Sequence, residues 1–596
     1  MTPQAAGPRP LARGAAAQSW RVRPADEDEV RRLAAGLDAP PLLARLLSLR
    51  GIRSPEDARL FLQAPLTGLH DPFEMLGMDA AAAHLAGEVE RGGPVGVYGD
   101  YDVDGITSTA LLVRFFRSLG IEAPYHVPRR LEEGYGLHLA GLLRLKEAGC
   151  RTVVTVDCGI TAAEVAAEAK AQGLRLIVTD HHRPPERLPE ALAVLNPRRP
   201  GCPYPFKGLT GAGIAFKLAA AVRRLLRDKG FARSLPNLKQ HLDLVALGTV
   251  ADVAPLLGEN HILVRAGLGA LSAPPGLPDR RKAGVRALQA AADLKADEIN
   301  AGHVGFVLGP RLNAAGRVGD PRAAVELLLT DDLAEAHAVA VLLDDWNHQR
   351  QELQQEALEE AEVLLAAAGE AGLGGAIVLA SERWHSGVIG IVASKLAEAY
   401  RLPAALIRLD GEGGRGSVRG VEGFHVYRAL EGCADCLVQF GGHKEAAGLA
   451  IRRGMVDAFR ARFQEASRLA LGPERGEEVL WLDASVGFSD LDLGLIERLE
   501  EMAPFGPGNP RPLLGAAGVE VVGVPGFAGR DREHLKLALR HQGRTMEAIG
   551  FGMGPLAREG GLPPGKIDIA CCPCVNRWRG STKLQLELKA IRPAGG

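Results

Sequence analysis

The stretch VYGDYDVDG, residues 97–105, decides the fold of the first half of the chain. Residues 94–100, PVGVYGD, are typical of a buried strand that ends in a turn. A helical pattern follows at 107–120. Two more apolar runs, at 152–159 and 174–182, alternate with a helical run at 161–173. Strands and helices alternating in this rhythm predict a doubly wound parallel sheet.

Polar residues follow each of these predicted strands. They are Asp100, Asp102 and Asp104 after the first strand, Asp157 after the second, and Asp180, His181 and His182 after the third. In a doubly wound sheet, ligands bind at the carboxyl ends of the strands, which meet at one edge. We therefore expect these side chains to meet in space, although they span about eighty positions of the sequence.

Three aspartates at alternate positions repel one another, and divalent cations remove that repulsion. A helix N-cap is an alternative explanation, but it needs only one of the three aspartates. A calcium loop is another, because Asp-x-Asp-x-Asp-Gly begins an EF-hand; here the twelfth position is not Glu, and a strand precedes the motif. Carboxylates and imidazoles without thiolates favour Mn²⁺ or Mg²⁺, and Asp252 in ADVAPL adds a further carboxylate.

The composition is that of an ordinary globular protein. The 596 residues are 46% hydrophobic and 24% charged, with a formal net charge of −2, so any polyanion must bind to local patches. No apolar run reaches the roughly 18 residues that a membrane helix needs. The first twenty residues lack the apolar core of a secretory signal, so we expect a disordered tail and a cytoplasmic protein.

The later segments predict three further parts of the molecule. Helical patterns dominate from 256 to 368, interrupted by a loop-like stretch at 309–321, and residues 333–368 predict one long helix that connects two lobes. A second strand-helix pattern from 374 to about 471 predicts a second α/β lobe. The last hundred residues alternate apolar and polar positions, which predicts a small β-barrel. Residues 504–596 carry 13 Lys and Arg against 7 Asp and Glu, a net of +6.

Four motifs, GDYDVDG, VDCG, TDHH and ADVAPL, resemble in order those of the DHH phosphoesterase superfamily. The resemblance is closest to the RecJ branch, single-strand-specific 5′ exonucleases, and continues through GPRLNAAGRV, WHSGVIGIVASKL, GRGSVRG, FGGHKEAAGL and PFGPGNPRP. It implies a DHH lobe with a doubly wound parallel sheet and a DHHA1 lobe, joined by a long helix and followed by an OB-fold barrel. We place the boundaries at 1–75 for the tail and a helical lead-in, 76–265 for DHH, 266–368 for the helical connector, 369–471 for DHHA1 and 472–596 for the OB-fold.

The resemblance also implies two divalent ions, Mn²⁺ or Mg²⁺. One is expected on Asp104, Asp157, His181 and Asp252, and the other on Asp100, Asp102 and a bridging Asp157. Two ions about 3.5–4 Å apart can activate a bridging water and stabilise the leaving oxygen. His182 is expected to face the scissile phosphate and Asp180 to orient a histidine. The expected catalytic residues are Asp102, Asp104, Asp157, His181, His182 and Asp252.

Substrate contacts are expected from residues in the other family motifs. These are Arg130, Arg311, Asn313, Arg317, Ser417, Arg419 and His443. Arginines suit phosphate oxygens because they bind them in a bidentate geometry. Arg129 departs from the family pattern, and an exposed role explains it equally well. We expect Trp384 to pack and His385 to face the cleft, while Arg577, Trp578 and Arg579 resemble a strand-binding patch or a structural hairpin edge.

The function implied by the resemblance is removal of nucleotides from the 5′ end of single-stranded DNA, in repair and recombination. The alternative is a phosphodiesterase of the same superfamily acting on short oligonucleotides or cyclic dinucleotides; such relatives lack the basic barrel. A nucleic-acid-binding protein without a metal site would have lost ligands that are all present here. We expect a monomer that works with a single-strand-binding protein and a helicase, without a membrane.

Overall fold

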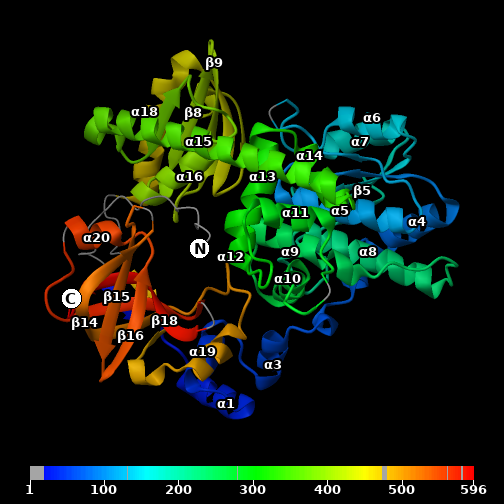
Figure 1. Cartoon of the computed structure of the whole chain (residues 1–596). Coiled ribbons are helices and arrows are strands. Elements are labelled where there is room, and N and C mark those ends of the chain that lie inside the picture. The colour runs from blue at the N-terminus through cyan, green and yellow to red at the C-terminus, as the bar shows by residue number, and fades with distance from the viewer. Residues whose placement is uncertain are drawn as a thin grey trace.

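The chain folds into two α/β lobes, a helical part between them and a β-barrel (Figure 1). The structure is a computed structural model, and it describes residues 19–130, 132–277, 279–472, 479–529, 531–559, 561–578 and 581–595. Residues 1–18 of the expected tail lie outside the described residues. Within the described ranges, no helix is long and apolar enough to cross a membrane.

The first lobe contains the predicted parallel sheet. Its order is β3-β2-β4-β5-β6, and every neighbouring pair is parallel, which confirms the doubly wound prediction. Alternate strand side chains pack into two separate cores, one under α4, α5 and α8 and the other under α6 and α7. The strands are β2 (Val95–Tyr98), β3 (Tyr125–His126), β4 (Thr152–Val156), β5 (Arg175–Thr179) and β6 (Ala193–Leu195). The helices are α4 (Met78–Arg91), α5 (Val103–Ser118), α6 (Leu139–Glu147), α7 (Ala163–Ala171) and α8 (Gly211–Asp228).

A group of helices continues the core of this lobe toward the second one. They are α9 (Leu242–Ala251), α10 (Gly258–Leu271), α11 (Ala283–Ala291), α12 (Ala301–His303), α13 (Gly309–Val318) and α14 (Pro321–Leu329). A π-helical turn at Val304–Leu308 joins α12 to α13. The buried side chains of this group share one hydrophobic cluster with α5 and α8. The first lobe and the helical part are therefore packed around a common core.

The prediction of a loop at 309–321 is wrong, because α13 occupies most of that stretch. Pro310 lies in the first turn of α13, directly after the π-helical turn that joins α13 to α12. Leu312 is buried in the core of the helical part. Gly316 lies against residue 101: a Cβ at Gly316 would come within 2.6 Å of the Tyr101 carbonyl oxygen. The glycine thus permits close packing, and the helix carries the motif side chains.

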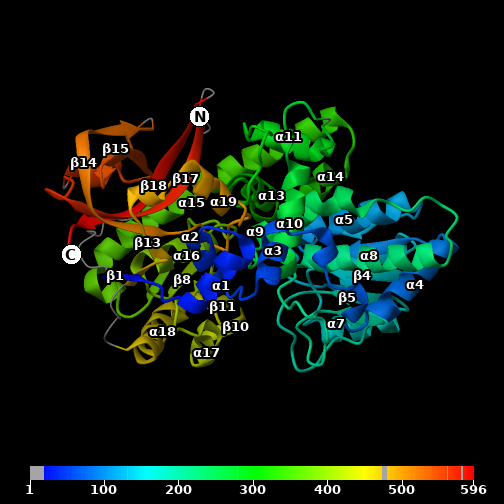
Figure 2. The same cartoon turned by 90° about the horizontal axis from the view of Figure 1, so that it is seen from below.

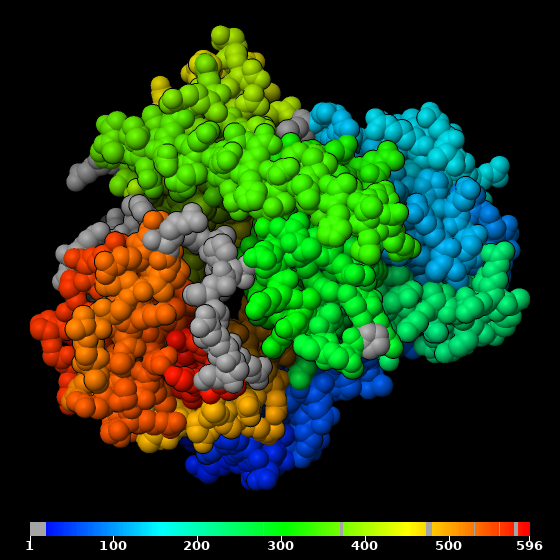
Figure 3. Space-filling view, viewed as in Figure 1, coloured from blue at the N-terminus to red at the C-terminus, as the bar shows by residue number. Residues whose placement is uncertain are grey.

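The long connecting helix is confirmed as α15 (Leu333–Gly372), with a non-helical residue at Gly369. It runs from the helical part to the second lobe and contacts both α13 and α16. Figure 3 shows it lying across the face of the molecule between the two lobes. Its position fixes one lobe relative to the other.

The second lobe is a mixed five-stranded sheet of order β10-β11-β9-β8-β7. Only β7 and β8 are parallel, and the other pairs are antiparallel. One face packs on α15 and α16, and the other on α17 and α18. The strands are β7 (Ile377–Ser381), β8 (Ala404–Asp410), β9 (Gly413–Arg419), β10 (Leu437–Gly442) and β11 (Ala446–Arg452). The helices are α16 (Ile389–Tyr400), α17 (Val426–Glu431) and α18 (Val456–Leu471).

The predicted barrel is confirmed as a closed five-stranded one. Its strands pair in the order β14-β15-β16-β18-β17, and β17 closes back onto β14. Alternate residues of β15, such as Leu535, Leu537 and Leu539, point into the core, as the period-two pattern predicts. The strands are β14 (Leu514–Ala528), β15 (His534–His541), β16 (Arg544–Gly550), β17 (Ile567–Trp578) and β18 (Ser581–Pro593), with α19 (Leu493–Glu500) before them and α20 (Gly554–Glu559) after β16.

The N-terminal helices pack against this barrel. Residues of α1 (Glu27–Leu37), α2 (Pro41–Leu49) and α3 (Pro55–Gln63) share one buried cluster with the barrel strands and α19. The first strand, β1 (Ser19–Val22), pairs in parallel with β12 (Val479–Leu482), and the Arg592 guanidinium lies 4.5 Å from the Trp20 ring centre. Figure 2 shows α1 and α2 beside α19, next to the barrel. The N-terminal helices and the C-terminal barrel therefore share one hydrophobic core.

Candidate active site

The three aspartates of the opening motif lie where β2 ends and α5 begins. Asp102 caps α5, because its Oδ1 accepts a hydrogen bond of 3.1 Å from the Gly105 N–H. Asp104 lies in the first turn of the same helix and is 1% exposed, and Asp100 is also buried. The carboxylates of Asp100 and Asp104 are thus held away from water.

Asp104 is fixed by the N-terminus of α8. Its Oδ2 accepts from the Gly211 N–H at 2.6 Å and its Oδ1 from the Ala212 N–H at 2.9 Å. A helix N-terminus suits a carboxylate because its first N–H groups have no intrahelical partner and carry partial positive charge. A Cβ at Gly211 would lie 2.7 Å from the Asp157 Cβ and 2.9 Å from the Asp104 Oδ2. The glycine therefore allows the start of α8 to approach both aspartates closely.

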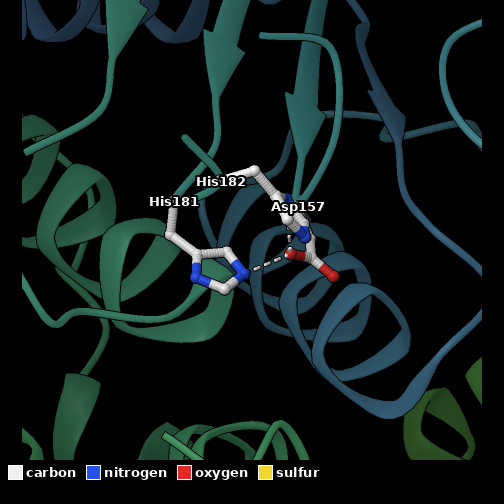
Figure 4. A group of neighbouring side chains, drawn as sticks. All are labelled: Asp157, His181 and His182. Carbon is white, nitrogen blue, oxygen red and sulfur yellow. Dashed lines mark ion pairs between the residues drawn. The ribbon is translucent and has the colours of Figure 1, made fainter. Parts of the chain in front are cut away.

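His181 follows β5 and lies among three carboxylates, two that follow strands and one that follows α9. Its Nε2 lies 3.0 Å from the Asp157 Oδ1, 3.8 Å from the Asp104 Oδ2 and 3.9 Å from the Asp252 Oδ2. Figure 4 shows the imidazole of His181 directed at Asp157, with His182 close to the same carboxylate; the two ring centres lie 4.4 Å apart. Asp157 itself has a positive φ of 61°, which turns the chain sharply after β4.

His182 is oriented by Asp180. The Asp180 Oδ1 lies 2.7 Å from the His182 Nδ1 and also accepts from the His182 N–H at 3.0 Å, while its Oδ2 accepts from the Ile160 N–H. These bonds leave the His182 Nε2 available on a partly exposed ring that lines the neighbouring cleft. Asp180 therefore orients His182, in the manner that the sequence predicted for one of the histidines.

The ligand atoms gather into overlapping groups that could each hold a metal ion. Within each group these atoms all lie within 4.8 Å of one another. The groups are Asp104, His181 and Asp252; Asp100, Asp102 and Asp157; and Asp157, His181 and His182. The first two closely match the two predicted sets of ligands, with Asp157 beside both through its contact with His181. The structure thus brings every predicted metal ligand into one cluster.

The electrostatics of the cluster indicate a need for cations. Burial, together with the neighbouring carboxylates, raises the pKa of Asp100, Asp104 and Asp157 well above its usual value. Burial and Asp102 raise the pKa of Asp252 to about 7, and burial lowers the pKa of His181 to about 3. Burial disfavours the charged His182, but its bond to Asp180 and the charges of Asp180, Asp252 and Asp102 together raise its pKa to about 9.

The residues present fit a divalent ion. Among the described side chains, Asp100 Oδ1, Asp157 Oδ1 and His181 Nε2 are buried atoms that make no hydrogen bond, and the last two face each other at 3.0 Å. A buried polar atom without a partner costs free energy, and a bound metal ion would supply the missing partner. The donors are carboxylate oxygens and imidazole nitrogens, a set that suits Mn²⁺ and Mg²⁺.

A large cleft of about 2130 Å³ opens beside the cluster, between the first lobe, the helical part and the DHHA1 lobe. Its described lining contains Asp100, Asp102 and His182, together with six of the seven predicted substrate-binding residues. The six are Arg130, Asn313, Arg317, Ser417, Arg419 and His443. His385 also lines the cleft, as predicted.

Three arginines in this cleft come from three parts of the fold. Arg317 on α13 is half-buried and donates to the Gly387 carbonyl at 3.2 Å. Burial and the nearby charges of Arg130, Arg350 and Arg419 lower its pKa to about 10. Arg419 on β9 donates to the Ser417 Oγ at 2.9 Å, and the Arg130 guanidinium lies 5.4 Å from the Tyr101 ring centre. Positive charges held this close suit a phosphate group.

Arg311 and Asn313 differ in where α13 directs them. Asn313 turns toward the site, and its Oδ1 accepts from the Val103 N–H at 3.2 Å. Arg311 lies outside the cleft: its Nε is 2.8 Å from the Asp344 Oδ1 on α15, and it donates to the Val307 carbonyl. A substrate role for Arg311 stays a prediction, and the contact that the structure gives it joins two helices.

Other sequence predictions fall outside the cleft. Trp384 is buried in the core of the DHHA1 lobe, as expected. Arg129 is exposed and pairs with Asp320 at 2.6 Å. Arg579 and the side chains of Arg577 and Trp578 lie outside the described residues.

Several cleft residues were missed by the sequence-based prediction. They include Tyr101, Tyr135, Arg198, Arg408 and Arg415. The Tyr135 ring is 53% exposed, and its centre lies 6.1 Å from that of His182. Its position shortly after Arg130 in the same turn-rich stretch was a usable signal. Arg408 gave none, because it follows an ordinary buried strand run.

Family models match three regions of the chain. They describe the N-terminal domain of the DHH family at residues 94–249, the DHHA1 domain at 373–468 and the RecJ OB domain at 482–590. The single-stranded-DNA-specific exonuclease RecJ of Bacillus subtilis is 36% identical, with 96% of this chain and 70% of that protein covered. The protein of the same name from Escherichia coli is 35% identical, with 97% and 100% covered.

Solved structures show the same likeness. The crystal structure of RecJ from Thermus thermophilus in complex with Mn²⁺ superposes with a TM-score of 0.79 at 32% identity, with 97% of this chain and 80% of that chain covered. Its complex with Mg²⁺ gives a TM-score of 0.73 at 30% identity, with 97% and 79% covered. The matches in sequence, domain order and fold together show that the chain belongs to the RecJ family of DHH and DHHA1 proteins.

Proposed function

We propose that this chain is a metal-dependent exonuclease that hydrolyses single-stranded DNA from its 5′ end and releases 5′-mononucleotides in DNA repair and recombination. One observation carries the proposal: five aspartates and His181 gather at the carboxyl edge of a parallel sheet and open onto a cleft lined by arginines. The names of the relatives support the substrate and the reaction, and the polarity rests on the family alone.

The proposed metal ligands are Asp100, Asp102, Asp104, Asp157, His181 and Asp252. When bound, two divalent ions supply a nucleophile at neutral pH and stabilise charge on the leaving oxygen. Two N–H groups of α8 hold the Asp104 carboxylate in one orientation at the cluster. Asp180 keeps the His182 ring in one orientation, with Nε2 toward the cleft, where it can bond to a phosphate oxygen.

The proposed substrate contacts come from both lobes. Arg130, Arg317 and Arg419 face the same region of the cleft and can neutralise a phosphate close to the metal ligands. Tyr135 presents a half-exposed ring beside His182, which suits stacking on a base. A single strand can offer an unpaired base and a bare phosphate together, and this supports the preference for single strands.

The basic barrel supports a long substrate over a dinucleotide. Its net charge of +6 over residues 504–596 provides an attractive surface for a backbone. OB-folds bind single strands along such surfaces. The alternative substrate, a short oligonucleotide or cyclic dinucleotide, would gain nothing from the barrel.

Finer features of the proposal come from the sequence and the resemblance. We propose that the chain acts as a monomer in the cytoplasm, with a single-strand-binding protein and a helicase as partners. We also propose the domain boundaries of the sequence prediction, with one addition: residues 19–63 share the core of the barrel, so they would be stabilised by it.

The test is a time course with Mn²⁺ on long single strands labelled at either the 5′ or the 3′ end, and on a dinucleotide. Asp157→Ala is the control, because it removes the carboxylate next to both ligand groups. The proposal predicts early loss of the 5′ label as a mononucleotide, abolished in the variant. Rapid cleavage of the dinucleotide beside an intact long strand would contradict it.

A further inference from the structure

The motif PFGPGNPRP, residues 504–512, lies outside both the metal cluster and the lining of the cleft. It forms the connection between α19 and β14, where the barrel begins. Its tip contacts the segment that follows α9, and the first residue of that segment is Asp252. The barrel domain therefore contacts the segment of a proposed metal ligand directly.

Two kinds of contact join the motif to the Asp252 segment. The Leu256 N–H donates to the Pro507 carbonyl at 2.7 Å, and the Leu256 side chain is buried. Gly506 lies so close that a Cβ there would come within 2.7 Å of the Leu256 Cδ1. The contact is thus a hydrogen bond plus close packing, four residues from Asp252.

Hydrogen bonds within the motif and from Arg50 hold the motif in place. Asn509 is 0% exposed, and its Nδ2 donates to the carbonyls of Met502 and Pro504 at 2.7 and 2.9 Å. Its Oδ1 accepts a hydrogen bond from the Arg50 Nε at 2.5 Å, and this bond joins the motif to the residue that directly follows α2. The Gly506 N–H donates to the Asn509 carbonyl at 2.9 Å. Such a network holds Pro507 and Gly506 in one arrangement.

The Asp252 segment is held by α9 at its start and by two other parts of the molecule further along. The N–H groups of Asp252, Val253 and Ala254 donate back to α9, to the carbonyls of Gly248, Val250 and Thr249 at 2.9, 3.2 and 3.4 Å. Val253 then adopts a φ of +58°, a strained conformation for a β-branched residue that persists when the surroundings fix it. On the DHH side, the Asn260 Nδ2 donates to the Pro255 carbonyl at 3.1 Å. On the barrel side, Pro507 supplies the matching contact.

We infer that residues 504–510 are a positioning element for Asp252, with Asn509 as the positioning residue that keeps the element rigid. The inference deepens the proposed function, since it rests on Asp252 as a metal ligand. It assigns the barrel domain a role at the metal cluster besides attraction of the strand. The N-terminal helices take part through Arg50, which explains why they pack on the barrel beside this motif.

The experiment measures Mn²⁺ affinity of the full chain by electron paramagnetic resonance of free Mn²⁺, without any nuclease assay. Asn509→Ala is expected to weaken binding about tenfold, the effect typical of removing a group that orients a metal ligand. Asn576→Ala is the matched control, because that barrel asparagine bonds only Gln585 among the partners described for it. The control should bind Mn²⁺ as the parent does.

A double-mutant cycle separates positioning from general loosening. In an Asp252→Asn background, where the ligand charge is already absent, Asn509→Ala should change Mn²⁺ affinity less than twofold. A tenfold loss in both backgrounds, or no loss in the parent, would overturn the inference. If Asn509→Ala does not fold, Gly506→Ala replaces it in the same cycle, because it leaves the hydrogen bonds of Asn509 intact and presses only on Leu256.

Failure of the proposed function looks different. A chain that binds Mn²⁺ through Asp252 but cleaves no single strand would contradict the nuclease proposal and leave the positioning result unaffected. A chain that cleaves single strands, but whose Mn²⁺ affinity ignores residue 509, would contradict only the positioning role.

Discussion

Replacing Gly211 with alanine tests how closely the metal cluster is built. Gly211 begins α8, and its N–H bonds Asp104 at 2.6 Å. The added Cβ would lie 2.7 Å from the Asp157 Cβ and 2.9 Å from the Asp104 Oδ2. Carbon atoms in contact prefer about 3.5–4.0 Å, so one carboxylate or the helix must move by about 1 Å.

The expected loss of activity follows from that displacement. A misplacement of about 1 Å in a reacting constellation can reduce the rate about 100-fold. Overpacking of a buried site also costs about 1–3 kcal/mol of stability, offset in part by the better helix propensity of alanine, about 1 kcal/mol. We therefore expect Gly211→Ala to remain folded and to lose about 100-fold in kcat.

The matched control is Gly213→Ala, two residues along the same helix. Its Cβ would meet the Leu209 Cδ2 at 3.0 Å, the end of an apolar side chain, and no proposed ligand is among its nearest neighbours. Steady-state kinetics on a 5′-labelled single strand, with melting temperatures for both variants, make the comparison. Equal activity of the two variants would refute the reasoning, because it would show that the cluster tolerates a methyl group between its carboxylates.

Three further predictions test the cleft, the metal and the core. Arg317→Met should raise KM for a single strand about 10- to 100-fold, since a hydrogen bond to a charged group contributes about 1.5–3 kcal/mol, whereas the exposed Arg129→Met should change it less than twofold; equal effects would contradict the assignment. The pKa of Asp252 is raised to about 7, so the metal-free chain loses the stability of the protonated carboxyl as pH rises from about 4 through 7, and Mn²⁺ should raise Tm more at pH 8 than at pH 5; an equal rise at both would contradict this. Lys217→Met should lower the unfolding free energy by about 3–5 kcal/mol in urea titrations, because it removes the ammonium group that lies 2.5 Å from the buried Glu259 carboxylate. A loss under about 1 kcal/mol would contradict this prediction.

The metal cluster was predictable because local pattern and topology agree there. Each apolar strand run ends in carboxylates or histidines, and parallel strands bring their carboxyl ends together. The rule therefore placed Asp157 and His181 beside Asp104 without any knowledge of distances. Asp252 needed the resemblance as well, because it ends a helix instead of a strand.

The error at α13 has a local cause. Glycines and a proline weaken a helical pattern, but Pro310 lies in the first turn and Gly316 faces the Tyr101 backbone. Tertiary packing on α15 stabilises the helix where the propensity does not. The same packing explains why Arg311 pairs with Asp344, a contact between helices that no sequence pattern indicates.

Contacts between distant segments were the hardest to predict. Nothing in residues 19–63 indicates that they share a core with strands near residue 590, or that Arg50 reaches Asn509. Period-two patterns did predict the barrel strands, because alternation reports only on one strand and its core. They carry no information on which helices cover the barrel.

The central claim is that the aspartates after β2, Asp157, His181 and Asp252 hold the divalent ions. Anomalous diffraction from crystals soaked in Mn²⁺, measured at the manganese absorption edge, locates the ions directly. The account predicts anomalous density on both sides of Asp157, one peak against Asp104, His181 and Asp252 and one against Asp100 and Asp102. Bound manganese elsewhere, with no peak beside Asp157, would contradict it.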